Sequence, residues 1–226
     1  MRVIRNTLSL AVLLCFVCSS QATLLRVKVE YSPGQDSSCS VLPGNSVKEE
    51  WKAELLARQS EFVQLWESEG PRLLATTEAI SGKDFALREI TARLTLCNSP
   101  SESFPQADRV TINMRYALGS FTPTPVSLRY KVDMLFHELL HIFLSQHPIK
   151  NSMLLQQHAA EPERVRDHLH LLALQKAVLL KLNEGDALRD VVAIDSALPG
   201  GYYKRVWELV NATDSEYLKY VAELSK

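Results

Sequence analysis

The chain has 226 residues, of which 46% are hydrophobic, and 25 basic against 26 acidic side chains give it a net charge of −1. This near-neutral balance does not indicate a basic surface of the kind that binds nucleic acid or an anionic membrane. Its length suits one full-sized domain preceded by a short leader.

The first 22 residues have the pattern of a secretory signal peptide. Arg2 and Arg5 precede an apolar run over residues 8–17, and the run is followed by the small-x-small sequence Ser20-Gln21-Ala22. The run is too short to span a bilayer, so we expect no membrane anchor. The sequence therefore predicts an exported protein, periplasmic or secreted, that is cleaved near Ala22 and whose residues 23–226 form a single domain.

Cleavage at this point would leave two cysteines, Cys39 and Cys97. An even pair in an exported chain predicts one disulfide, and two buried free thiols are the alternative. The bridge would tie the N-terminal segment to the strand that we expect to end at Cys97.

The first half of the chain predicts a small sheet. Apolar and polar residues alternate in three segments that should be strands: Leu24–Tyr31, Phe85–Cys97 and Arg109–Ala117. The Pro-, Gly- and Ser-rich residues 32–44 and the polar residues 98–107 predict loops. A helix should begin after Ser46 and run to about Glu67, where Gly70-Pro71 should break it before a second helix that ends near Ser81.

The second half of the chain has a helical pattern throughout. The helices that we expect are Ser127–Gln146, Pro162–Asn183, Asp186–Val192, Tyr202–Val210 and Ser215–Leu224. Strands first and helices last predict an α+β fold, with a small N-terminal antiparallel or mixed sheet in residues 23–120 and a mostly helical C-terminal part in residues 121–226.

The sequence His137-Glu138-Leu139-Leu140-His141 lies inside the helix expected over residues 127–146. On a helix the two histidines stand about 40° apart and one turn above each other, so their imidazoles can bind one metal ion. Glu138 is the only charged residue between Met134 and Leu144. An accidental pair on a surface helix is the alternative, but such a helix should carry charges at other positions too.

Around this H-E-x-x-H motif, over about a dozen residues and in the order of its elements, the chain resembles the zincin superfamily of zinc metallopeptidases. The resemblance implies one zinc ion per chain, bound by His137, His141 and a third residue, with Glu138 as the catalytic base and a peptide or protein as the substrate. It also implies that Arg109–Ala117 is the sheet edge that pairs with extended substrate. Tyr202 or Tyr203 would stabilise the oxyanion, unless these tyrosines only pack at the start of a helix.

Two readings of the third ligand come from two branches of that superfamily. In the metzincin pattern it would be His147, followed by Met153 in the Met-turn, but Leu144 stands where that pattern has the glycine that ends the helix. In the gluzincin-like variant a second helix supplies the ligand. This variant favours His168, which groups with apolar positions of its helix, over Glu161 and His158. His170 falls on the side of that helix that we expect to be exposed.

Two other classes of function stay open. A catalytically silent zincin-like domain would bind zinc or a partner without hydrolysis. A helical scaffold protein with an accidental motif would bind no zinc. Glu138 argues against a purely structural zinc site, because the motif gives it no role as a ligand.

Overall fold

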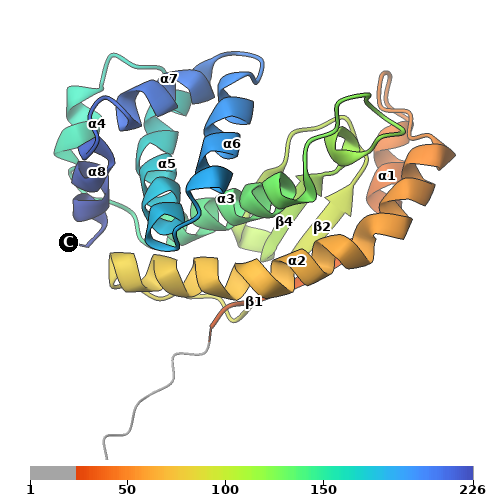
Figure 1. The fold of residues 1–226 in the computed structure, drawn as a ribbon, viewed down its shortest axis with the longest axis horizontal. Helices are drawn as coiled ribbons and strands as arrows, with labels where there is room; N and C mark the ends of the chain where they lie inside the picture. Colours follow the sequence, from red (N-terminus) through yellow and green to blue (C-terminus); the bar gives the residue numbers. More distant parts are fainter. Residues whose placement is uncertain (1–23, 226) are drawn as a thin grey trace, which may run out of the picture.

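The computed structural model describes residues 24–225, so the predicted signal peptide and its cleavage site lie outside the described part of the chain. This part has an α+β fold, as the sequence predicts: a small sheet lies beside a C-terminal half made of helices (Figure 1). None of its helices is long and apolar enough to cross a membrane.

The sheet has four strands in the order β1-β2-β4-β3. β2 is parallel to both β1 and β4, whereas β3 is antiparallel to β4, so the sheet is mixed. The strands are β1 (Arg26–Tyr31), β2 (Glu89–Thr95), β3 (Glu102–Phe104) and β4 (Arg109–Asn113).

The prediction that Arg109–Ala117 forms an edge of the sheet is wrong. β4 lies between β2 and β3, ends at Asn113, and is followed by a 3-10 turn over Arg115–Ala117. The edge beyond β4 is instead β3, inside the segment expected to be a loop. Alternation of apolar and polar residues indicates which side chains lie on each face of a strand, but not which strands lie next to it. β3 has only three residues, too few for such an alternation to be recognised.

The segment expected to be a loop before residue 45 contains the helix α1 (Pro33–Ser40). Its buried Asp36 accepts hydrogen bonds from the Thr95 hydroxyl at 2.6 Å and the Leu96 backbone N–H at 2.9 Å. The Cys39–Cys97 disulfide, which the sequence predicts, joins the same two segments. These tertiary contacts stabilise a helix whose own residues favour turns.

The predicted break at Gly70-Pro71 does not occur, because α2 runs without interruption over Glu49–Ser81. Proline removes one backbone donor, but Phe62, Leu73 and Leu74 on either side of it are fully buried in the core. This burial favours one continuous helix despite the missing hydrogen bond. A side chain at Gly70 would collide with the ring of Trp66, which packs over the helix there.

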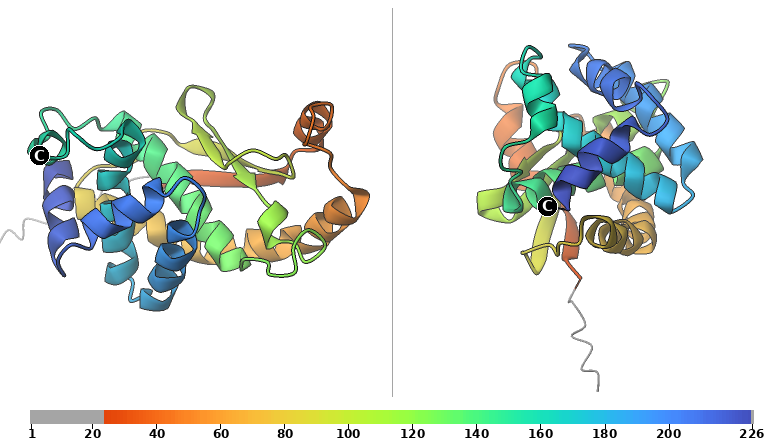
Figure 2. Two further views of the ribbon diagram at one scale, coloured as in Figure 1. Left: turned by 90° about the horizontal axis from the view of Figure 1, so that it is seen from above. Right: turned by 90° about the vertical axis from the view of Figure 1, so that its left-hand side faces the viewer.

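The helix that carries the H-E-x-x-H motif is α3 (Leu128–Gln146), and the Ser127 hydroxyl caps it by accepting from the Tyr130 N–H at 3.1 Å. α3 contacts β3 and β4 as well as α5 and α6, so it joins the sheet to the helical half (Figures 1 and 2). The remaining helices are α4 (Met153–Gln157), α5 (Glu163–Lys181), α6 (Gly185–Ser196), α7 (Tyr202–Val210) and α8 (Glu216–Leu224).

Candidate metal centre

Three histidine side chains from two helices lie close together. α3 supplies His137 and His141, and α5 supplies His168. One ring nitrogen of each residue lies within 4.8 Å of those of the other two, and the rings of His141 and His168 have centroids 4.8 Å apart. A group of three imidazoles at this spacing is able to hold a metal ion.

The hydrogen bonds of two of these histidines fit a metal site. His168 Nδ1 lies 2.7 Å from the backbone carbonyl oxygen of Arg164, and His137 Nδ1 lies 3.3 Å from Gln175 Oε1. Both partners are acceptors, so each Nδ1 carries the proton and donates it. Each Nε2 then carries a lone pair in place of a proton, which is the usual arrangement of histidine ligands.

Burial keeps the three imidazoles neutral, as metal ligands must be. It lowers the pKa of His137 well below its ordinary value and the pKa of His141 to about 4, and neighbouring histidines add to both effects. Burial also lowers the pKa of His168. The donor set therefore fits a borderline-soft divalent cation such as zinc.

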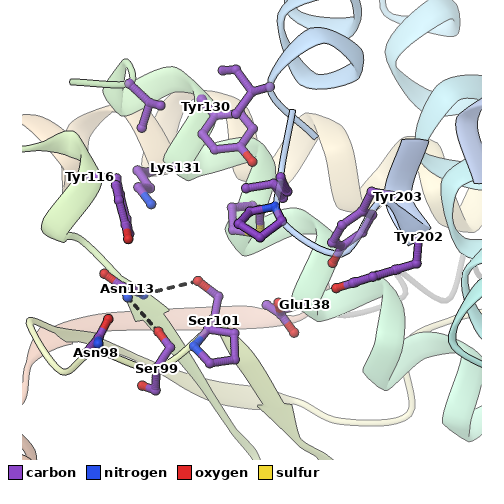
Figure 3. Close-up of a pocket in the computed structure, with 16 residues that line it drawn as sticks. Asn98, Ser99, Ser101, Asn113, Tyr116, Tyr130, Lys131, Glu138, Tyr202 and Tyr203 are labelled. Atoms are coloured by element: carbon purple, nitrogen blue, oxygen red, sulfur yellow. Dashed lines mark hydrogen bonds between the residues drawn. The ribbon is translucent and has the colours of Figure 1, made fainter. Parts of the chain in front are cut away.

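Glu138 lies beside this group and is 4% exposed. Burial, and after it the negative charge of Glu102, raises the pKa of Glu138 to about 8. Within residues 24–225, no protein group hydrogen-bonds its carboxyl, which faces a pocket (Figure 3). A carboxyl group in this setting is suited to exchange a proton with a molecule in the pocket.

Tyr203, at the start of α7, points its hydroxyl at the histidines. The oxygen lies 3.3 Å from His137 Nε2, and the tyrosine ring lies 5.1 Å from that of His168 between centroids. Burial, with smaller contributions from Tyr202 and Glu138, raises the pKa of Tyr203, so its hydroxyl stays protonated. It is therefore a hydrogen-bond donor beside the metal centre.

A pocket of about 530 Å³ opens beside the centre, between the helical half and the loops at the ends of β2 and β4. Figure 3 shows Glu138, Tyr202 and Tyr203 at one end of it and Lys131 and Tyr116 at the other. The other residues that line it are Asn98, Ser99, Pro100, Ser101, Asn113, Val126, Tyr130, Met134, Ile194, Leu198 and Pro199.

Two alternative third ligands that the sequence offers lie elsewhere. The absence of glycine at Leu144 lets α3 continue to Gln146, so His147 caps the helix and its Nε2 contacts the Asp84 carbonyl oxygen at 2.9 Å. Glu161 forms an ion pair with Arg205. Neither residue belongs to the group of three histidines.

His158 and His170 form contacts with α8 instead. His158 Nε2 lies 2.9 Å from the Tyr220 hydroxyl, and His170 Nε2 lies 2.9 Å from a carboxylate oxygen of Glu223. The expectation that His170 is exposed is wrong, since it is 4% exposed. α8 covers that side of α5, which the pattern of α5 alone does not show. Met153 is exposed at the start of α4, so it forms no Met-turn beneath the histidines.

Sequence reasoning did not assign Gln175 to the site. It lies seven residues after His168, two turns further along the same face of α5. The spacing of seven residues from His168 could have indicated that Gln175 lies near the site. A glutamine among leucines is equally consistent with an ordinary buried position of the helix.

A second group of potential ligands, Asp36, Cys39 and Cys97, has a different explanation. Both sulfur atoms are joined in the disulfide, and Asp36 is occupied by Thr95 and Leu96. The histidine group is therefore the better metal site within residues 24–225.

Comparisons of the chain with protein-family models, with curated proteins and with solved structures found no match. The interpretation of the site therefore rests on its residues and their geometry.

Proposed function

We propose that this protein is an exported zinc-dependent peptidase. The observation that carries the proposal is the meeting of His137, His141 and His168 beside the buried carboxyl group of Glu138 at the wall of a pocket. Three histidines are a common ligand set of catalytic zinc, and they leave one coordination position open.

Zinc at this site would polarise a substrate carbonyl and lower the pKa of a water molecule. A nearby cation would also favour the carboxylate form of Glu138, against the effect of burial. Glu138 would accept a proton from the attacking water and deliver it to the departing amine. The Tyr203 hydroxyl would donate a hydrogen bond to the oxygen that becomes negative.

The shape of the site suits an extended peptide. The pocket is lined by apolar side chains together with amides and hydroxyls, which is typical of substrate-binding sites. β3 pairs with β4 on one side only, so among the described residues its other edge is open to a further strand. We propose that β3, in place of Arg109–Ala117, pairs with the backbone of the substrate.

The test is hydrolysis of a mixed peptide library by the mature protein loaded with zinc, followed by mass spectrometry of the products. Glu138→Gln should bind zinc normally and lose about 10²–10⁴-fold in rate, because it removes the base and keeps the shape. Wild-type protein that binds zinc but cleaves no peptide, with Glu138→Gln behaving identically, would instead support a catalytically silent zinc-binding domain.

A further inference from the structure

The side chain of Lys131 is a buried cation without a protein partner. It lies on α3, is 5% exposed and lines the pocket that contains Glu138. Within residues 24–225 it forms no ion pair and no hydrogen bond, and its one charge-related contact is with the ring of Tyr130 at 5.9 Å. A buried ammonium group is costly unless a partner binds it.

The surroundings of Lys131 point to an anionic ligand. Of the residues that line the pocket, only Lys131 and Glu138 have side chains that are acidic or basic in the usual sense. They stand seven residues apart on α3, about two turns or roughly 10 Å along its axis. Burial alone lowers the pKa of Lys131, to about 8, with no carboxylate acting against it. The lysine is therefore free to pair with a group brought in by a ligand.

A second donor faces the same pocket. The Ser101 hydroxyl oxygen accepts from the backbone N–H of Asn113 at 3.1 Å, and among the described residues it donates to no protein group. Figure 3 shows Ser101 between Asn113 and Glu138, on the sheet side of the pocket opposite Lys131. This hydroxyl is able to donate to a polar group of a ligand whose carboxylate pairs with Lys131.

We propose that Lys131 binds a carboxylate of the substrate and makes this site selective for acidic peptides. The inference rests on the proposed peptidase function. An extended peptide advances about 3.3 Å per residue, so the roughly 10 Å from Glu138 places the carboxylate about two or three residues from the cleaved bond. Its source is either an aspartate or glutamate side chain or the C-terminal carboxylate of a short peptide.

The experiment uses synthetic hexapeptide pools that differ only at the second and third positions on either side of the cleaved bond. One pool has glutamate there and the other has glutamine. A third comparison sets free C-terminal carboxylates against C-terminal amides. Wild-type protein should cleave the glutamate pool, or the free-carboxylate peptides, with a kcat/KM about tenfold or more above that of the neutral counterpart. Which pair shows the difference identifies the source of the carboxylate.

Two variants of one residue are the matched controls. Lys131→Met should abolish the preference while leaving the zinc content unchanged, and Lys131→Arg should retain much of it. Binding of the same pools to zinc-loaded Glu138→Gln, measured by calorimetry, gives a readout that does not depend on catalysis. Selective binding to this variant, with no hydrolysis by the wild-type protein, would reject the peptidase proposal and keep the carboxylate subsite.

The inference is overturned by equal cleavage and equal binding of acidic and neutral pools. It is also overturned by failure of both pools to bind, or by a preference that persists in Lys131→Met. The first and third of these results would leave the peptidase proposal intact.

Discussion

His137 Nδ1 lies 3.3 Å from Gln175 Oε1, and Gln175 Nε2 in turn donates to the backbone carbonyl oxygen of Asp133 at 3.4 Å. One buried side chain of α5 is thus bonded to two points of α3, the helix that carries the H-E-x-x-H motif. This bond holds the His137 ring in the tautomer whose Nε2 carries a lone pair.

Gln175→Leu should therefore weaken zinc binding by about 10–100-fold, since the ring of His137 loses the acceptor that orients it. The matched control is Gln175→Glu, which keeps an oxygen acceptor for His137 and, in its protonated form, a donor for the Asp133 carbonyl oxygen. It should bind zinc more tightly than Gln175→Leu does. Competition with a fluorescent zinc chelator measures both affinities. Equal weakening in the two variants would mean that packing, and not the hydrogen bond, is what matters.

Tyr203→Phe should lower kcat by about 10–100-fold with little change in KM or zinc content. The variant keeps the ring that packs against His137 and His168 and removes only the donor beside the centre. Tyr202→Phe, in the adjacent pocket residue, should have a smaller effect. Steady-state kinetics on one cleaved peptide decides between the two tyrosines, and an unchanged kcat in Tyr203→Phe would exclude it as the oxyanion donor.

Lys131→Met should stabilise the protein at neutral pH, and the gain should disappear in alkali. The pKa of Lys131 is about 8 in the folded chain against 10.5 as its ordinary value, so folding penalises the charged form. The penalty is complete below pH 8 and shrinks as pH rises from 8 to 10.5, where the folded chain has lost the proton before the unfolded one.

The expected gain at pH 7 is on the order of 1 kcal/mol or more. Urea unfolding of wild type and variant at several pH values between 7 and 10.5 gives the difference in their free energies of unfolding. The contributions of the other titrating groups cancel in this difference. A gain that does not depend on pH would show that the lysine carries no charge penalty. If Lys131→Met is more stable than the wild type and also loses substrate selectivity, Lys131 serves function at a cost in stability.

The sequence identified the elements whose signals are local. Ser127 before an apolar helical run predicts the start of α3 to within a residue, and the predicted bounds of α7, Tyr202–Val210, match those in the structure. The histidine pair follows from the helix alone, because four residues make one turn. His168 could be favoured as their neighbour only by resemblance and by its position on the face of α5.

The elements that the sequence mispredicted depend on contacts between distant segments. α2 continues through Pro71 because core packing on both sides outweighs one lost hydrogen bond. The neighbours of β4 are set by a three-residue strand that has no detectable alternation. The environment of His170 depends on α8, and that of Lys131 depends on the loops at the sheet side of the pocket. The periodicity of α5 or α3 alone cannot predict either environment.

Replacing both disulfide cysteines by serine should lower the free energy of unfolding by about 2–4 kcal/mol. Cys39 and Cys97 close a loop of 58 residues, and opening it restores conformational entropy to the unfolded chain. Urea unfolding of the double variant, and of the wild type with and without a reductant, measures the loss. Identical midpoints under reducing and oxidising conditions would show that the bridge contributes nothing to stability.

The zinc content of four purified proteins decides whether the three histidines form a zinc site: wild type, His168→Ala, His147→Ala and Glu138→Gln. Mass spectrometry of metals should find about one zinc ion per chain in all of them except His168→Ala. That variant should lose most of its zinc, because His168 completes the group formed by His137 and His141. Zinc retained in folded His168→Ala, or no zinc in folded wild-type protein, would show that these three histidines do not form a zinc site.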